Sequence, residues 1–254
     1  LQPGNIRLQT TNCRTAVFFF HPTLRFILLR GGAHPKLGFL MPLTAAEVES
    51  LFAKLARARD PKPELSYRTP LDLLVAVVLS AQTTDKAVNK VTAELWKHCR
   101  TAQDYLAWGQ ERLEESCRSI GLFRNKSRAI IGLCQSLLEN HHGLVPPERE
   151  ALMRLPGVGR KTANVVLNVA FGQPTLAVDT HVFRVANRTG LAAANTPEET
   201  EEQLLAVIPA QYLRHAHHYL LLHGRYCCTA RKPDCENCPI RQECRSAPGK
   251  NCRP

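Results

Sequence analysis

Four cysteines near the C-terminal end of the sequence could bind a metal together. Intervals of six, two and five residues separate them, in a polar segment that also carries two prolines. Zinc would accept four thiolates, but zinc sites usually contain two Cys-x2-Cys pairs, and only the middle pair here has that spacing. A cubane iron–sulfur cluster offers one corner to each of four cysteines, which favours a cluster over zinc and over purely structural cysteines. The four residues are Cys228, Cys235, Cys238 and Cys244.

A glycine hairpin forms the second candidate site. Residues 155–162 read LPGVGRKT, with one helix expected before them at 147–152 and another after them at 160–171. Glycines permit a tight turn and a close approach of a ligand, and the first N–H groups of a helix lack partners inside it. Such a helix start favours an anion such as phosphate, although a plain helical corner is the alternative. A P-loop is excluded because Arg160, and not glycine, precedes Lys161.

Charge and cysteine usage narrow the class of protein. The chain has 254 residues, enough for one large or two small domains, and a net charge of +11 that suits a polyanionic partner. Small secreted disulfide domains are denser in cysteine than this chain, so we expect a reducing compartment such as the bacterial cytoplasm, with a mitochondrial or nuclear location left open. No apolar run reaches the length of a membrane span.

The first 40 residues differ from the rest of the chain. They contain five Arg or Lys residues and no acidic residue, and they lack a clear helical period. A capping box, Thr44-Ala45-Ala46-Glu47, follows directly after Met41. We therefore expect the folded protein to start near Met41, with 1–40 as a non-domain extension. This extension is either upstream sequence read in frame or a transit peptide.

The elements that must position these candidate sites are helical. Thr69-Pro70 is a typical helix start, and the run 71–79 after it is apolar on all sides, which predicts a central buried helix. A second capping box is expected at 196–199, and Gly121 and Gly224 are expected to end helices. With no convincing strand pattern, we predict an all-α fold of about ten helices. Apolar residues at helical spacing mark further helices around 88–95, 113–120, 130–138, 182–186, 204–208 and 212–220.

Five segments and the cysteine spacing together resemble the endonuclease III family of helix-hairpin-helix DNA glycosylases. They occur in the order of that family, at compatible spacing, and extend from Met41 to about Arg245. The intervals of six, two and five residues resemble the iron–sulfur loop of the family. The segments are 79–85 (LSAQTTD), 120–122 (IGL), 155–165 (LPGVGRKTANV), 178–181 (VDTH) and 223–226 (HGRY).

The resemblance implies a fold, an activity and a cofactor. A six-helix domain with the hairpin would span 63–173, and an iron–sulfur domain would combine 41–62 with 174–254, with double-stranded DNA bound over the cleft between them. The implied enzyme is a monomeric, bifunctional glycosylase and abasic-site lyase of base excision repair that acts on oxidised pyrimidines. Its cofactor would be a [4Fe-4S] cluster, and the family spacing selects Cys228 rather than the neighbouring Cys227 as the first ligand.

The resemblance also implies a catalytic pair, Lys161 and Asp179. A base inside a duplex is out of reach, so the nucleotide must flip out before a neutral lysine amine can displace the base. The resulting iminium would allow β-elimination of the 3′ phosphate. Without the resemblance, Lys161 would be interpreted as a phosphate contact. Asp179 is expected to cap the helix around Val182, and by resemblance it also stabilises positive charge on the sugar.

Further residues are expected to bind DNA. Gln82 and Leu122 match positions that fill or wedge the base stack, with a loop amide and a core leucine as the alternatives. Gly157, Gly159 and Arg160 belong to the phosphate-binding hairpin. Four cations of the cysteine segment would contact phosphates without reading sequence, unless they form only a solvated basic face. These cations are Arg231, Lys232, Arg241 and Arg245.

Two rival functions share part of this pattern. An adenine mismatch glycosylase has the hairpin, the aspartate and the cluster, but it typically lacks a lysine at position 161 and carries a further C-terminal domain. A non-catalytic DNA-binding module would keep the hairpin and the cluster as a scaffold. Lys161 counts against the adenine mismatch glycosylase, and Lys161 together with Asp179 argues against the non-catalytic module.

Overall fold

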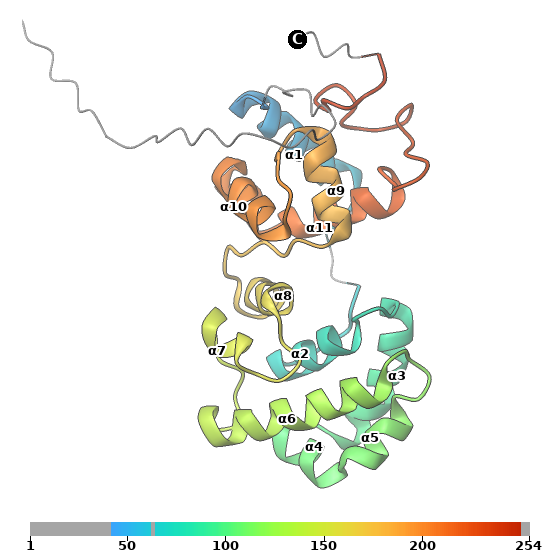
Figure 1. Ribbon diagram of the computed structural model, residues 1–254, viewed down its shortest axis with the longest axis vertical. Helices are drawn as coiled ribbons and strands as arrows, with labels where there is room; N and C mark the ends of the chain where they lie inside the picture. Colours follow the sequence, from blue (N-terminus) through green and yellow to red (C-terminus); the bar gives the residue numbers. More distant parts are fainter. Residues whose placement is uncertain (1–41, 62–63, 250–254) are drawn as a thin grey trace, which may run out of the picture. The chain divides into compact units, whose positions relative to one another are not determined.

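The computed structural model describes residues 42–61 and 64–249, so the extension expected at 1–40 lies outside the described residues. The described ranges form eleven α-helices and no strand, which confirms the all-α prediction (Figure 1). None of these helices is long and apolar enough to span a membrane. The helices are α1 (Ala45–Ala58), α2 (Pro70–Leu79), α3 (Asp85–His98), α4 (Ala102–Trp108), α5 (Gln110–Ser116), α6 (Phe123–His141), α7 (Arg149–Met153), α8 (Arg160–Phe171), α9 (Thr180–Thr189), α10 (Pro197–Val207) and α11 (Ala210–Tyr226).

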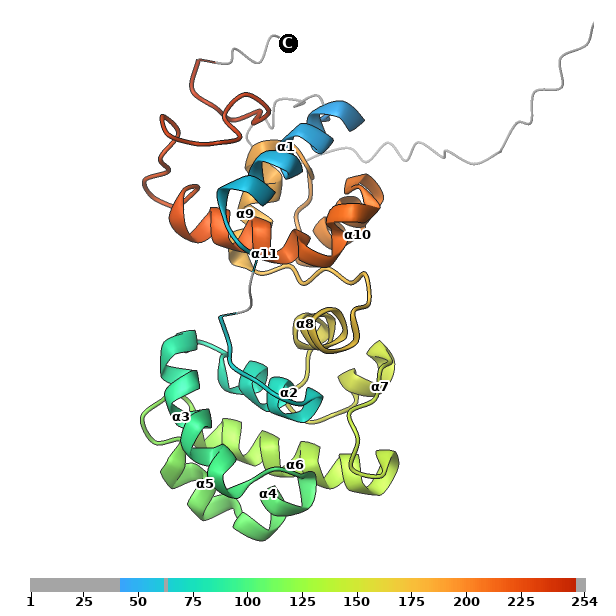
Figure 2. The same ribbon diagram turned by 180° about the vertical axis from the view of Figure 1, so that it is seen from behind.

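The first hydrophobic cluster contains residues of all the helices from α2 to α8, and α2 is its central helix. α2 packs against both α8 and α6, and the two views place it between them (Figures 1 and 2). Eight of its ten residues are buried, as the apolar run predicts. Thr69 accepts a hydrogen bond from the Asp72 N–H, and Pro70 holds the first helical position, so the expected helix start is confirmed. This core supports α8, the helix whose first turn carries Lys161.

The second hydrophobic cluster joins α1 to the C-terminal helices. α1 packs against α11, and α9 packs against both α10 and α11. The segment after α11 returns to α1, where Arg245 Nη2 lies 2.7 Å from Glu47 Oε2. α1 therefore shares its core with α9–α11, although α2–α8 separate them in the sequence (Figure 2).

Two short helices differ from the expected pattern. α5 ends at Ser116, and Ile120 and Gly121 lie in the turn that follows, so Gly121 does not end a helix. Ile120 is nevertheless buried, which explains why its apolar spacing resembled that of a helix. α4 was not expected, although Thr101 and Asp104 form a reciprocal capping box at its start. At seven residues it is too short to show a clear helical period.

α11 continues through Gly224, where the sequence predicted its end. The helix reaches Tyr226 instead. A Cβ atom on Gly224 would lie 2.8 Å from the Cβ of His181 and 3.2 Å from Cγ2 of Val185, both on α9. The glycine therefore permits the close approach of two helices rather than a turn.

The remaining helix starts follow local signals closely. The capping box of Thr44 and Glu47 is present at α1. Thr196 caps α10, but the reciprocal half of the expected box is missing, because Glu199 Oε2 accepts from the Asn195 N–H at 2.9 Å. α7 begins at Arg149, slightly later than expected, whereas α8 has the predicted bounds.

Candidate active site

The two glycines of the hairpin between α7 and α8 have different roles. Gly157 has φ +78°, and a Cβ atom there would lie 2.7 Å from the Cβ of Ala129, so both its backbone conformation and its surroundings require glycine. Gly159 is the N-cap of α8 in an extended conformation, and a Cβ atom there would meet nothing within 4 Å. Gly157 thus shapes the turn, while Gly159 leaves open space in front of the unpaired N–H groups of α8.

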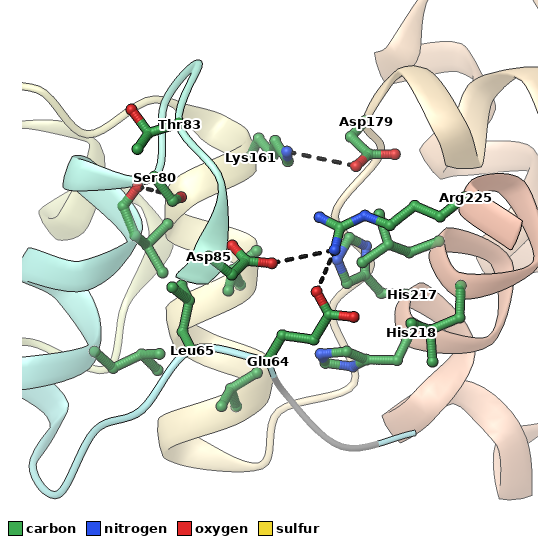
Figure 3. Close-up of a pocket in the computed structure, with 16 residues that line it drawn as sticks. Glu64, Leu65, Ser80, Thr83, Asp85, Lys161, Asp179, His217, His218 and Arg225 are labelled. Atoms are coloured by element: carbon green, nitrogen blue, oxygen red, sulfur yellow. Dashed lines mark hydrogen bonds and ion pairs between the residues drawn. The ribbon is translucent and has the colours of Figure 1, made fainter. Parts of the chain in front are cut away.

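Lys161 and Asp179 lie together at one edge of a cavity. Lys161 Nζ is 3.7 Å from Asp179 Oδ2, and the two side chains are 54 % and 13 % exposed (Figure 3). Asp179 Oδ1 accepts hydrogen bonds from the backbone N–H groups of His181 and Val182, each at 2.9 Å. One carboxylate therefore caps α9 with one oxygen and presents the other to the amine. The predicted cap is present, and the catalytic role of the pair stays a prediction.

The surroundings of Asp179 favour its ionised form. Burial raises the pKa of this carboxyl, but the hydrogen bond from the Val182 N–H and the nearby His217, Lys161 and His181 lower it more, so the net pKa is below its usual range. An ionised Asp179 can accept a proton from the neighbouring amine and can stabilise a positive charge that develops between them.

The cavity has a volume of about 140 Å³. Side chains of α2, α3 and α8 line it together with side chains of α11. Next to the Lys161–Asp179 pair, Arg225 Nη1 donates hydrogen bonds to Glu64 and, at 3.1 Å, to Asp85 Oδ2 (Figure 3). Polar groups therefore approach the same space from two sides.

Two adjacent histidines of α11 complete the wall of the cavity. His217 is buried and its Nδ1 lies 2.7 Å from the carbonyl oxygen of Ala177, so Nδ1 carries the proton that donates to this oxygen. Burial lowers the pKa of His218 to about 4, with the neighbouring His217, His215 and Arg225 adding to the decrease. Burial also lowers the pKa of His217, although the nearby Asp179 opposes this decrease, so burial favours the neutral form of both rings.

Five of these cavity residues carried no predicted function. Arg225 lies within the segment HGRY and Asp85 within LSAQTTD, so their positions inside these motifs could have identified both residues. Glu64, His217 and His218 lie outside the motifs, and only the fold brings them to the cavity.

Gln82 and Leu122 share an unusual backbone conformation. Their φ angles are +53° and +58°, in the left-handed region that non-glycine residues rarely adopt. Both side chains are exposed, Leu122 to 55 %, so the alternative of a core leucine is wrong. The buried Lys126 donates to Thr83 Oγ1 at 2.8 Å and thereby ties the loop of Gln82 to α6, which begins directly after Leu122. Strained residues of this kind often serve a function.

Arg160 is partly engaged within the protein. Its Nε donates to Glu201 Oε2 at 2.8 Å, and Arg149 Nη2 lies 3.4 Å from the other oxygen of this nearly buried carboxylate. This ion-pair network connects both helices of the hairpin to α10. The predicted phosphate contact of Arg160 is therefore left to its terminal N–H groups.

The four predicted cysteine ligands lie in the irregular segment after α11, and two of them contact α9. Each is partly buried. Arg188 of α9 donates to Cys228 Sγ at 3.6 Å, and its carbonyl oxygen accepts from Cys244 Sγ at 3.5 Å. Burial raises the pKa of Cys244, and the nearby thiols of Cys228, Cys238 and Cys235 add to the increase. Four thiolates here need a compensating positive charge, which an iron–sulfur core supplies, so the donor set fits such a cluster.

Cys227 occupies a different place from its neighbour Cys228. Within the described ranges, the group of potential ligands that lies closest together is His223, Cys227 and Cys238, whose donor atoms are within 4.8 Å of one another. The four predicted ligands are not gathered this tightly. A cubane cluster holds its cysteines apart at separate corners, so its ligands need not approach one another as closely as those of a single ion.

The cations of the cysteine segment fall into two groups. Arg231, Lys232 and Arg241 are exposed. Arg245 instead contacts Glu47 of α1 at 2.8 Å and 2.7 Å, which gives it a structural role between the ends of the described chain.

Comparisons with known proteins agree with this geometry. The family model of HhH-GPD superfamily base excision DNA repair proteins matches residues 75–210, and the model of the iron–sulfur binding domain of endonuclease III matches residues 228–244. Endonuclease III of Rickettsia conorii is 56 % identical over 185 residues, which cover 73 % of this chain and 88 % of the relative. Endonuclease III of Escherichia coli is 52 % identical over 190 residues, which cover 74 % and 90 %. A solved structure of a trapped endonuclease III–DNA covalent intermediate matches with a TM-score of 0.76 and 47 % identity, over 81 % of this chain and 97 % of that chain.

Proposed function

The chain belongs to the endonuclease III family, and on that premise we propose that it removes oxidised pyrimidines from duplex DNA through a lysine Schiff base. As a member of this family it is a DNA-binding glycosylase and abasic-site lyase of base excision repair, with a [4Fe-4S] cluster as its cofactor. The damaged-base class, the covalent chemistry and the residues below are the proposal.

The contact between Lys161 and Asp179 carries this proposal. The amine and the carboxylate oxygen lie 3.7 Å apart, beside a cavity that a flipped base can enter. Asp179 Oδ2 accepts a proton from the lysine, and the neutral amine then attacks C1′ of the sugar. The bond from C1′ to the base breaks, and the base leaves with the electron pair and takes up a proton. The trapped covalent intermediate of the relative supports such a step.

Strand cleavage follows from the same covalent bond. The amine then loses its second proton, the C1′–O4′ bond breaks, and O4′ takes up a proton as an iminium forms between Lys161 and C1′. The iminium acidifies C2′, so removal of a proton from C2′ expels the 3′ phosphate by β-elimination. Water then releases the lysine. An activated water in place of the amine would release the base but would not cleave the strand.

The DNA is proposed to lie across the hairpin and the exposed loops. Gly157 and Gly159 bring the start of α8 to a phosphate, and Arg160 adds charge there. Gln82 and Leu122 enter the stack that the flipped base leaves, which their exposure supports. The exposed cations of the cysteine segment are proposed to contact phosphates further along the duplex.

Two domains and one cluster site complete the proposal. We assign the first hydrophobic cluster to the six-helix domain at 63–173 and the second to the iron–sulfur domain at 41–62 and 174–254. Cys228, Cys235, Cys238 and Cys244 hold the cluster, and the matched iron–sulfur range begins and ends at two of them. When bound, the cluster supplies iron–thiolate bonds that fix the irregular segment after α11. A monomer in the bacterial cytoplasm is the expected form.

Borohydride trapping tests the chemistry directly. The reagent reduces an iminium to a stable amine, so wild-type protein should become crosslinked to duplexes that carry an oxidised pyrimidine or an abasic site. Lys161→Gln should give no crosslink, no base release and no incision. Lys97→Gln is the matched control, because Lys97 is an exposed lysine of α3 that pairs with Glu94. A crosslink that persists in Lys161→Gln would show that another amine performs the reaction.

A further inference from the structure

The two residues proposed to enter the base stack lie on separate loops. Gln82 belongs to the turn between α2 and α3, and Leu122 ends the turn between α5 and α6. Both have a left-handed backbone, which persists at a non-glycine residue only when its surroundings hold it there. Because both side chains would enter the same gap in the duplex, the two loops must keep a fixed position relative to each other.

Lys126 contacts both loops at once. Its backbone N–H donates to the carbonyl oxygen of Leu122 at 3.0 Å, which closes the first turn of α6. Its Nζ donates to Thr83 Oγ1 at 2.8 Å, and the Thr83 hydroxyl donates in turn to the carbonyl oxygen of Ala81 at 3.4 Å. Ala81 and Thr83 flank Gln82 in the sequence, so these contacts hold the backbone on both sides of it.

Stability alone does not explain a lysine at this position. The residue is only 5 % exposed, and burial lowers the pKa of its amine. Among the described residues no carboxylate pairs with this amine, because its neighbours are the Thr83 hydroxyl and the Cys117 thiol, whose pKa burial raises to about 11. A buried charge without an ionic partner costs free energy, which an apolar side chain of the same length would avoid. Only the lysine, however, can donate to Thr83.

We propose that Lys126 is a positioning residue that couples the two loops, so that Gln82 and Leu122 enter the DNA stack as one unit. The inference rests on the proposed function and adds to it the contact that keeps the two inserted side chains together. Lys126 itself is buried and does not need to touch DNA. Without its amine, the strain at Gln82 is no longer opposed and the turn relaxes, so base opening fails while the Lys161–Asp179 pair keeps its geometry.

Two duplexes separate base opening from the later chemistry. Both carry 5,6-dihydroxy-5,6-dihydrothymine, opposite adenine in one duplex and opposite cytosine, with which it forms no Watson–Crick pair, in the other. A mismatched base needs less energy to leave the stack. The measured quantity is the ratio of single-turnover base release, paired over mismatched, by the cluster-containing enzyme. Thr83 also lines the cavity, but an effect there cancels in this ratio because the same base is released from both duplexes.

Lys126→Met keeps the length of the side chain and removes the donor, and Thr83→Val removes the acceptor. We expect each to lower the ratio roughly 10-fold, the lower end of what a hydrogen bond from a charged donor contributes. The double variant should be no worse than either single variant, because both remove the same contact. The melting temperature of Lys126→Met should not fall, since the buried charge is gone. Lys97→Met, at an exposed lysine of α3, is the matched control and should keep the wild-type ratio.

A background without the inserted side chains tests the coupling itself. In Gln82→Ala/Leu122→Ala protein, whose ratio should already be low, Lys126→Met should have no further effect. A further loss of the same size in that background would overturn the coupling role. So would a wild-type ratio in both Lys126→Met and Thr83→Val, or a Lys126→Met protein that loses melting temperature and keeps its ratio.

Failures of the proposed function give a different result. A wild-type enzyme that incises an abasic duplex but releases the oxidised base from neither duplex would contradict the proposed damaged-base class. A wild-type ratio in Gln82→Ala/Leu122→Ala would contradict the proposed insertion of these side chains, and the inference with it. Both outcomes are visible in proteins that retain Lys126, so they are distinguishable from a failure of the coupling.

Discussion

The contact between α9 and α11 should break when Gly224 becomes alanine. The new Cβ atom would lie 2.8 Å from the Cβ of His181 and 3.3 Å from its Cα. Both atoms are fixed to the α9 backbone, so no side-chain rotation relieves the contact and the helices must separate. Overpacking of this kind costs about 1–3 kcal/mol, and the better helix propensity of alanine offsets about 1 kcal/mol. The net loss of unfolding free energy should be up to about 2 kcal/mol, or up to about 8 °C in Tm.

Urea denaturation, thermal melting and abasic-site incision measure the effect of Gly224→Ala. Incision should also fall, because α9 begins directly after Asp179 and its displacement moves the carboxylate away from Lys161. Gly121→Ala is the matched control, since a Cβ atom at Gly121 would meet nothing within 4 Å. Its unfolding free energy should change by less than about 0.5 kcal/mol. A Gly224→Ala protein with wild-type stability and incision would refute the close-packing argument.

Four further substitutions test the catalytic, metal and DNA-binding assignments. Asp179→Asn should slow release of a damaged base far more than incision of a preformed abasic site, where the glycosidic bond is already broken; equal slowing would contradict this role. The pKa of Asp179 is lower in the folded protein than in the unfolded chain, where it is about 4. The ionised carboxylate therefore stabilises the folded protein above the unfolded pKa, and this stabilisation is lost as the pH falls through the folded pKa. The difference in unfolding free energy between the wild type and Asp179→Asn should accordingly shrink in acid titrations. Cys235→Ser should lose iron, visible absorbance and solubility together, while Cys227→Ser should keep them; iron loss in Cys227→Ser would reassign the first ligand. Gly159→Asp should weaken binding to damaged and undamaged duplex alike and flatten its salt dependence, and an unchanged salt slope would remove the hairpin from the interface.

Local signals made most of the helices predictable. The caps at Thr44 and Thr69, the apolar run of α2 and the cap at Asp179 all depend on residues within a few positions of one another. Such interactions form in nearly any tertiary context, so the pattern of residues specifies them. The bounds of α8 were predictable for the same reason, because Gly159 and Gly172 flank it.

Contacts between distant residues were not predictable from the pattern. Arg225 meets Glu64 across 161 positions and Asp85 across 140, and no local rule pairs them. Gly224 has the local appearance of a helix end, yet the approach of α9 decides its role. Arg160 likewise suggested only a phosphate contact, because its carboxylate partner Glu201 lies on another helix.

The left-handed backbone at Gln82 and Leu122 has a consequence for engineering this protein. A side chain in this conformation costs roughly 1 kcal/mol or more relative to glycine, and Leu122, which is 55 % exposed, gains little from burial in the free protein. Glycine at either position would therefore raise the melting temperature while removing a side chain proposed to enter the base stack. A screen that rewards heat resistance alone would select against these two residues early, and the resulting proteins would be more stable and worse at opening DNA.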